Sequence, residues 1–126
     1  MNPPKPPIPP LKSIPLNAIF FGFLFSANAI ALVEIPSTID SDFKITPEQL
    51  EASITPKTKM VFFNSPNNPS GTIYTEEEYR ALAKVLEKHP QIYILSDEIY
   101  EHINYDDKPF SFAAIESMYD RTITVN

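Results

Sequence analysis

The alternation of apolar and polar stretches is clearest in the second half of the chain. Two short apolar runs, Met60 to Phe63 and Ile92 to Leu95, have the length and composition of buried strands. Polar clusters follow at once, Asn64 to Gly71 after the first run and Ser96 to Glu101 after the second. Ligands bind outside the carboxyl ends of parallel strands in an open α/β sheet. The pattern therefore predicts one binding crevice that both clusters face.

The segment between the two runs predicts a helix that connects parallel strands. Thr75 and Glu78 have the spacing of a capping box, and Pro90 prevents the helix from continuing. The apolar positions between them recur at helical spacing. They are Tyr79, Leu82, Ala83 and Leu86. We predict parallel strands at 60–64 and 92–96 and a helix over 76–89 that covers one face of the sheet.

Weaker patterns precede this unit. Leu32 to Ile35 is predicted to be a strand, and Asp40 to Lys44 a polar connection. Thr46, Pro47 and Gln49 then predict a short helix, because a capping threonine, a first-turn proline and a glutamine at the third position favour a helix start.

Three further segments follow the second polar cluster. Residues 104–108 are predicted to be a polar loop, residues 110–119 an irregular or helical segment, and residues 121–125 a final strand rich in threonine, isoleucine and valine. The inward-facing residues of the middle segment are predicted to be Phe112, Ile115 and Met118.

The first 32 residues differ from the rest. Residues 1–15 hold seven of the fourteen prolines, which favours an extended arm without packed structure. Residues 14–33 are mostly apolar, and four interpretations stay open: a signal-peptide core before Ala27-Asn28-Ala29, a membrane-spanning helix, a core element, or a disturbed, non-native start. We divide the chain into an arm, 1–32, which is disordered or non-native, and a regular domain, 33–126.

The composition of the chain excludes several classes of partner and of chemistry. The formal net charge is −6 and the isoelectric point about 4.8, so we expect no nucleic-acid partner. The chain has no cysteine, which excludes disulfides and thiolate chemistry. Glu98 and Glu101 could form an acid/base pair, or a metal cluster with His102, but their spacing fits no standard ligand set, and we expect no metal site. Gly71 is interpreted as a turn glycine.

Two motifs resemble those of a known family. Ser65 to Gly71 is similar to the N-P-T-G segment, and Ser96 to Glu101 to the S-D-E-x-Y segment, of fold-type I pyridoxal-phosphate (PLP) aminotransferases. The residues around the two motifs look most like those of the aspartate aminotransferase branch. The resemblance covers Val33 to Asn126, the middle of the family's large domain. It implies an α/β fold, here a partial three-layer αβα sandwich of the PLP-dependent transferase major domain.

The resemblance also implies three cofactor-binding residues. Asp97 matches the carboxylate that stabilises the protonated ring nitrogen, and Asn68 and Tyr100 match the residues that hold the phenolic oxygen. Each residue also has a structural interpretation. Asp97 and Asn68 are common turn residues, and a tyrosine is often a half-buried aromatic. Only their joint order along the chain favours the functional interpretation.

The family's Schiff-base lysine would lie just after Asn126, and none of the eight lysines occupies its position. We therefore expect a truncated PLP-dependent transaminase that has no catalytic residue of its own and is inactive alone. The parent family transfers amino groups between amino acids and 2-oxo acids, as cytoplasmic homodimers, and we expect no membrane partner. Two alternatives stay open: a non-catalytic, aminotransferase-like binding module, and a secreted or membrane-anchored protein led by residues 14–33.

Overall fold

The computed structural model describes residues 31–103 and 109–126. The chain divides into two units, Met1–Glu34 and Ile35–Asn126. Only residues 31–34 of the first unit are among the described residues. The interpretations of the arm and of residues 14–33 therefore stay predictions. The predicted polar loop at 104–108 also lies outside the described residues.

The strand predicted at Leu32–Ile35 is wrong, because these residues form no regular element. Leu32 and Val33 are 54% and 63% exposed. An apolar run becomes a strand only where its backbone N–H and C=O groups meet a partner strand, and the described sheet offers none to this run. Its composition alone could not reveal that lack of a partner.

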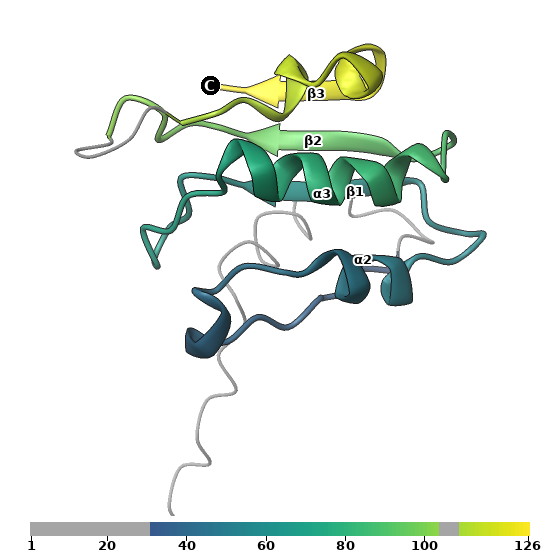
Figure 1. Cartoon of the computed structure of the whole chain (residues 1–126), viewed down its shortest axis with the longest axis horizontal. Helices are drawn as coiled ribbons and strands as arrows, with labels where there is room; N and C mark the ends of the chain where they lie inside the picture. The colour runs from purple at the N-terminus through teal and green to yellow at the C-terminus, as the bar shows by residue number, and fades with distance from the viewer. Residues whose placement is uncertain (1–30, 104–108) are drawn as a thin grey trace, which may run out of the picture. The chain divides into compact units, whose positions relative to one another are not determined.

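Three parallel strands form the sheet, in the order β1-β2-β3. They are β1 at Met60–Asn64, β2 at Tyr93–Asp97 and β3 at Thr122–Val125. The register pairs Asn64 with Asp97 and Asp97 with Val125, so the carboxyl ends of all three strands lie at one edge (Figure 1). The two parallel strands and the final strand predicted from the sequence are confirmed, and the class is α/β.

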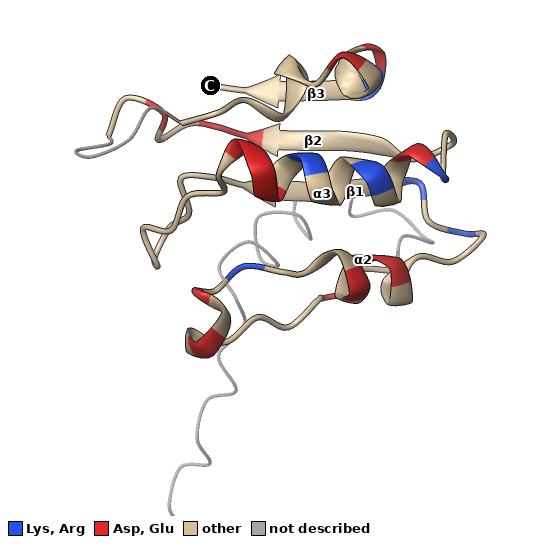
Figure 2. Ribbon diagram, viewed as in Figure 1, with Lys and Arg blue, Asp and Glu red and all other residues tan. Residues whose placement is uncertain are grey.

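Helix α3, Glu76–Glu87, lies across one face of the sheet (Figure 1). Its capping box forms as predicted: Thr75 Oγ1 accepts from the Glu78 N–H at 3.2 Å, and Glu78 Oε2 accepts from the Thr75 N–H at 2.7 Å. The first turn is acidic, which suits the positive end of the helix dipole (Figure 2). All four predicted apolar residues are buried, and Val85 is buried with them. The helix ends two residues before the predicted limit, at a Lys88 cap.

Four aromatic rings fill the space between the sheet and α3. Phe63 of β1 stacks on Phe112 at 5.1 Å between ring centroids and meets Tyr79 of α3 edge-on at 5.8 Å. Tyr74 stacks on Tyr79 at 4.9 Å. Phe112 begins η2, Phe112–Ala114, a single 3₁₀ turn. The burial predicted for the 110–119 segment is confirmed, because Phe112, Ile115 and Met118 are all buried.

The predicted short helix is confirmed as α2, Pro47–Ser53, with Thr46 and Gln49 forming its capping box. Leu50 joins the core from this helix and is 1% exposed. The connection before it is more ordered than the sequence indicated. It holds one 3₁₀ turn, η1 at Ile39–Ser41, followed by Asp42 and Phe43 with φ values of 51° and 54°.

One arginine joins the C-terminal segment to the end of α3. Arg121 is the last residue of η3, Glu116–Arg121. Its Nη1 donates to the carbonyls of His89 and Ile92 at 2.8 and 3.1 Å, and its Nη2 donates to the Leu86 carbonyl at 2.9 Å. The Leu86 and His89 carbonyls lie at the helix C-terminus, where a positive charge is favourable, and the Ile92 carbonyl directly precedes β2. The guanidinium therefore caps α3 from outside it.

The sheet face opposite α3 carries exposed apolar side chains. Successive strand residues point to opposite faces, so Ile94 and Ser96 enter the core while Tyr93 and Asp97 take the other face. The exposed apolar residues of that face are Met60, Tyr93, Ile123 and Val125.

Among the described residues, no helix is long and apolar enough to cross a bilayer.

We expect the 126-residue chain to self-associate through this face, since exposed apolar surface on a short sheet favours association. Replacing Ile123 with lysine should lower the apparent molecular mass in concentration-dependent light scattering. Tyr119→Lys is the matched control, because Tyr119 is also exposed, at 68% against 50% for Ile123, but belongs to η3. An equal effect of both changes would show that general charge, rather than this face, controls association.

Candidate functional site

The predicted site begins at the loop that follows β1. Asn64, the last residue of β1, accepts at Oδ1 from the Asn68 N–H at 3.1 Å and from Asn67 Nδ2 at 3.2 Å. Its own Nδ2 donates to the Asp97 carbonyl at 3.3 Å, and the Ser65 N–H donates to the same carbonyl at 3.1 Å. The loop is thus bonded both to itself and to the end of β2.

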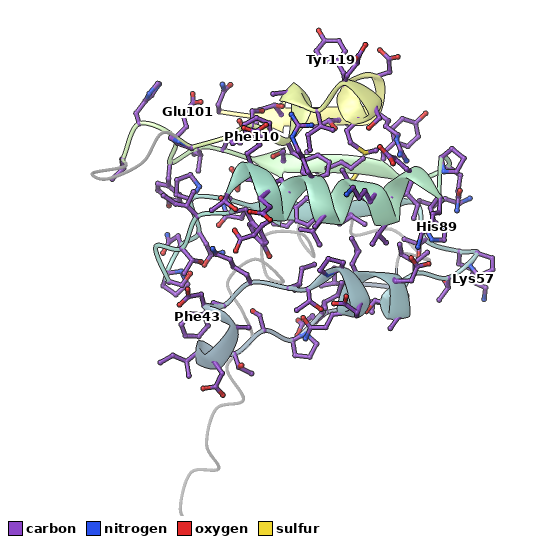
Figure 3. The ribbon with its side chains drawn as sticks, in the orientation of Figure 1. Phe43, Lys57, His89, Glu101, Phe110 and Tyr119 are labelled. Carbon is purple, nitrogen blue, oxygen red and sulfur yellow. The ribbon has the colours of Figure 1, made fainter. Side chains whose placement is uncertain are left out.

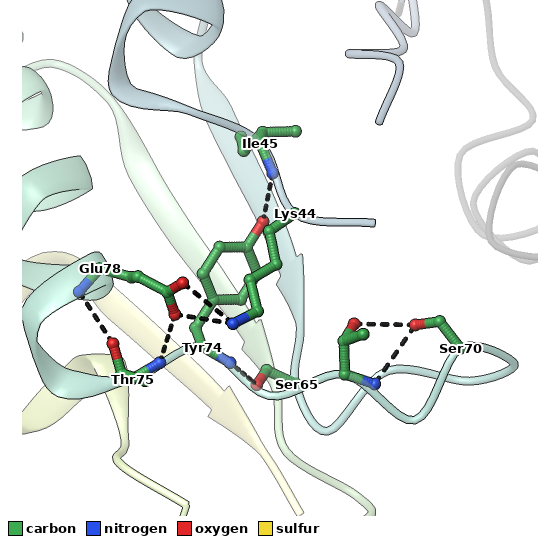
Figure 4. A network of polar contacts seen from close by, with 8 residues as sticks. Lys44, Ile45, Ser65, Ser70, Tyr74, Thr75 and Glu78 are labelled. Atoms are coloured by element: carbon green, nitrogen blue, oxygen red, sulfur yellow. Dashed lines mark hydrogen bonds and ion pairs between the residues drawn. The ribbon is translucent and has the colours of Figure 1, made fainter. Parts of the chain in front are cut away.

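A second network closes the tip of this loop. The Asn67 carbonyl accepts from the Gly71 N–H at 2.8 Å, and Asn67 Oδ1 accepts from the Ser70 hydroxyl at 2.8 Å. The Ser70 and Thr72 hydroxyls lie 2.8 Å apart (Figure 4). The peptide bonds before Pro66 and Pro69 are cis. Because so many turn groups are bonded internally, the loop has a defined shape although Asn68 at its tip is exposed.

Gly71 has φ of +73°, a conformation that side chains with a Cβ rarely adopt. A Cβ at this position would meet no atom within 4 Å, so any cost of substitution comes from the backbone alone. We expect Gly71→Val to lower the free energy of unfolding by about 1–3 kcal/mol in urea titrations. Gly71→Asn is the control, since asparagine tolerates this region. Equal stability of both variants would contradict the interpretation of Gly71 as a turn glycine.

Besides the Ser65–Asp97 backbone bond, a hydrogen bond between side chains joins the two motifs. Asn68 Nδ2 donates to the Tyr100 hydroxyl oxygen at 2.9 Å, across 32 residues of sequence. Tyr100 follows β2 and is half-buried. Figure 3 shows Glu101, the next residue, at this end of the sheet and His89 and Lys57 at the opposite end. The structure therefore brings Asn68 and Tyr100 together at the carboxyl end of the sheet.

Asp97 lies at the same edge, as the last residue of β2. Its carboxylate is half-buried, and Oδ1 accepts from the Ile99 N–H at 3.3 Å. By strand alternation its side chain leaves the sheet on the face opposite α3, as does that of its register partner Asn64. All three sequence-predicted residues thus follow the carboxyl ends of β1 and β2. Among the described residues, no hydrogen bond joins the Asp97 carboxylate to Asn68 or Tyr100.

Glu98 is a buried residue beside this site rather than one of its exposed groups. It is 6% exposed, and its Oε1 accepts from the Ser96 and Ser111 hydroxyls, each at 2.8 Å. The sequence had suggested a pair with Glu101 or a metal cluster with His102. Glu101 instead faces His102 at 3.5 Å on the exposed side, and the described residues hold no group of three or more acidic, histidine or cysteine side chains suited to a metal.

Tyr79 is a buried polar residue that the sequence analysis counted only as part of an apolar stripe. Its hydroxyl makes no well-formed hydrogen bond among the described residues, although the Ser65 and Ser96 side chains lie close enough to act on its pKa. Burial raises the pKa of Tyr79, and the nearby Glu98 carboxylate raises it further. The phenol is therefore neutral at physiological pH. Its chief contribution is the ring, which packs in the aromatic core beneath the loop.

A polar network ties the start of the loop to the segment before α2 (Figure 4). The Tyr74 N–H donates to Ser65 Oγ at 3.1 Å, and the Tyr74 hydroxyl accepts from the Ile45 N–H at 2.8 Å. Lys44 lies beside it and forms a 2.9 Å ion pair with Glu78. Burial raises the pKa of Tyr74. This network therefore joins the start of the loop to the segment before α2.

The Glu78 carboxyl has a lowered pKa. Its partial burial acts to raise the pKa, but the Thr75 N–H and the Lys44 ammonium outweigh that effect. A lowered folded-state pKa adds stability above the unfolded-state pKa, about 4.3, and this stability is lost as the pH falls through the folded-state value. We expect Glu78→Gln to abolish this part of the acid-induced loss, seen in urea titrations between pH 3 and pH 7 as a change below about 1 kcal/mol, because solvent screens the pair.

Glu77→Gln is the matched control for this effect. Glu77 lies in the same helical turn and forms no ion pair among the described residues. It should leave the pH dependence of stability nearly unchanged. If both variants flatten that dependence equally, the helix dipole rather than Lys44 is responsible.

Comparison with known proteins gives the site its context. The family described as aminotransferase class I and II matches residues 22–126. An aspartate/prephenate aminotransferase of Cereibacter sphaeroides is 52% identical over 96 residues, which are 75% of this chain and 24% of that protein. An aspartate aminotransferase of Rhizobium meliloti is 50% identical over 88 residues, 68% of this chain and 22% of that protein.

Solved structures of aspartate aminotransferases are also similar to this chain. The crystal structure of the Rhizobium meliloti aspartate aminotransferase matches with a TM-score of 0.68 and 44% identity, over 70% of this chain and 22% of that one. The Thermus thermophilus aspartate aminotransferase with maleate matches with a TM-score of 0.66 and 39% identity, over 73% and 23%. The chain therefore spans about a quarter of the length of these relatives. The resemblance inferred from the two motifs is confirmed.

Proposed function

Because this chain belongs to the class I and II aminotransferase family, whose members depend on PLP, we propose that Asn68, Asp97 and Tyr100 are the ring-binding half of a PLP site. The parent activity would be amino-group transfer between an amino acid and a 2-oxo acid. The observation that carries the proposal is the 2.9 Å hydrogen bond between Asn68 and Tyr100. It joins the two family motifs at the end of the sheet where α/β proteins bind ligands.

The residues present fit the polar groups of such a ring. When bound, PLP withdraws electrons from the substrate carbon, and it does so best with a protonated ring nitrogen. A half-buried carboxylate such as Asp97 favours a proton on a facing nitrogen, because opposite charges attract more strongly where solvent is partly excluded. Asp97 would thus hold that proton in place.

The phenolic oxygen of the ring requires donors, and the Asn68–Tyr100 pair supplies them. Asn68 donates one amide proton to the Tyr100 oxygen. The Tyr100 hydroxyl proton is therefore directed elsewhere, and Asn68 keeps a second amide proton. Two donors from neighbouring groups would stabilise an anionic ligand oxygen. Without a ligand, water can take the same place.

The rest of the parent function also belongs to the proposal. Relatives are named for aspartate and prephenate, and we infer an amino acid and a 2-oxo acid as substrates here, without selecting one. A homodimer in the cytoplasm follows from the family resemblance alone. For the 126-residue chain by itself we expect ring contacts but no transamination, because none of its eight lysines matches the family's catalytic position.

Titration with pyridoxamine 5′-phosphate tests the proposal. This probe carries an amine in place of the aldehyde, so it cannot form imines with surface lysines. We expect Asp97→Asn to weaken binding at least about tenfold, roughly 1.4 kcal/mol, in calorimetric or fluorescence titrations. Asp120→Asn is the matched control, because Asp120 is exposed on η3. Equal affinities of the wild type and Asp97→Asn would overturn the assignment of Asp97.

A further inference from the structure

Asn64 lies where the two halves of the proposed site meet. Its side chain bonds the loop of Asn68 through Oδ1 and the backbone of Asp97 through Nδ2. We propose that Asn64 is a positioning residue: it holds Asn68 against Tyr100 and fixes the distance between that pair and Asp97. The identity of the ligand rests on the proposed function, but the positioning itself does not.

The exposure of Asn68 shows why its position depends on hydrogen bonds. Asn68 is exposed, so core packing cannot fix its position. The two prolines of its loop, Pro66 and Pro69, have no backbone N–H and cannot anchor the loop by donating a hydrogen bond. The hydrogen bonds of Asn68 itself, from its N–H to Asn64 and from Nδ2 to Tyr100, are what hold its side chain beside Tyr100.

The chemistry of the surroundings also fixes the orientation of the Asn64 amide. The Asn68 N–H is a donor and requires an oxygen, whereas the Asp97 carbonyl is an acceptor and requires an N–H. Rotating the amide by half a turn would place donor against donor and acceptor against acceptor. Only a side chain with one acceptor and one donor at this spacing satisfies both strand ends. Aspartate has nearly the same shape but lacks the donor.

The register of the sheet makes this bridge effective. Asn64 and Asp97 are register partners at the last positions of β1 and β2. The Ser65 N–H shares the Asp97 carbonyl, so two bonds converge on the backbone of the residue proposed to face the ring nitrogen. A change at Asn64 therefore acts on Asn68 and Asp97 together, although Asn64 need not touch the ligand.

Hydrogen exchange measured residue by residue by NMR tests the positioning directly. In Asn64→Asp we expect the Asn68 amide to exchange at least about tenfold faster, because Oδ1 is no longer held by the bond to Asp97 and the new charge repels that carbonyl. Asn64→Ser is a second variant, which removes the bridge without adding charge. Asn68 exchange at the wild-type rate in a folded variant of either kind would overturn the proposal.

Gln49→Glu is the matched control. The Gln49 amide also bridges two backbone groups, accepting from the Thr46 N–H at 2.8 Å and donating to the Pro36 carbonyl at 3.1 Å, but it lies on α2. It should lose the same kind of bond and leave Asn68 exchange unchanged. Faster Asn68 exchange in Gln49→Glu would mean that general loosening, rather than Asn64, releases the loop, and would count against the proposal.

Pyridoxamine 5′-phosphate affinity provides the second readout, through a double-mutant cycle. We expect Asn64→Asp and Asn68→Ala each to weaken binding severalfold, and the double variant to lose less binding free energy than the sum of the two single losses, because part of the effect of Asn64 acts through Asn68. Additive losses would overturn that dependence. If the wild type binds no probe, the proposed function fails, while the exchange rates of Asn68 still decide whether Asn64 positions the loop.

Discussion

Replacing Arg121 with methionine is expected to lower the free energy of unfolding by about 3–5 kcal/mol, or to prevent folding. The guanidinium donates to the carbonyls of Leu86, His89 and Ile92, and methionine fills similar space without any donor. The three acceptors would then lie partly buried and without their charged donor. Urea unfolding followed by circular dichroism measures the loss.

Two further variants make this result specific. Arg121→Lys keeps the charge, but a single ammonium cannot reach carbonyls that two guanidinium nitrogens now share, so an intermediate loss is expected. Arg80→Met removes an exposed arginine whose partner is Glu76 in the next turn, which should cost well under about 1 kcal/mol. If Arg80→Met costs as much as Arg121→Met, net charge rather than the cap explains the effect.

Truncating Phe63 to alanine is expected to cost about 3–5 kcal/mol. The ring is 3% exposed and contacts three others, those of Tyr74, Tyr79 and Phe112. Its removal would leave a cavity at the centre of the core that the remaining rigid rings cannot fill. The loss should appear as a lower urea midpoint in fluorescence or circular dichroism with little change in slope.

Phe43→Ala is the comparison for this variant. Phe43 is 47% exposed and belongs to the turn after η1. Its removal should cost less than about 1 kcal/mol, since little apolar area leaves the core. A similar cost at both positions would mean that the aromatic cluster does not dominate the stability of this unit.

The sequence predicted the elements whose signals are local. Each capping box depends on residues only three positions apart, and both formed as expected, at Thr46 and at Thr75. The strands β1 and β2 were predicted because a predicted helix separates two apolar runs. A helical crossover connects parallel strands, so parallel pairing was the simplest arrangement. Burial in the 110–119 segment was likewise predicted from the spacing of its apolar residues.

Features that depend on distant partners were not predicted. Nothing near Arg121 indicates that it will cap a helix 35 residues earlier, and nothing near Glu98 shows that Ser111 will cover it. The failed strand at 32–35 has the same cause, because strand formation depends on a partner elsewhere. The meeting of Asn68 and Tyr100 was implied by family resemblance and strand order. The role of Asn64 required the geometry of both strand ends.

The cap on α3 also has a consequence for how the chain is made. Arg121 follows Leu86 by 35 residues, so at about 5–20 residues per second the ribosome adds it roughly 2–7 s after the end of the helix. A lone helix of twelve residues is marginal in water. During those seconds the nascent α3 lacks its C-terminal donor and β2 lacks its neighbour β3. The contacts of α3 with Arg121 and of β2 with β3 therefore form only after β3 leaves the exit tunnel.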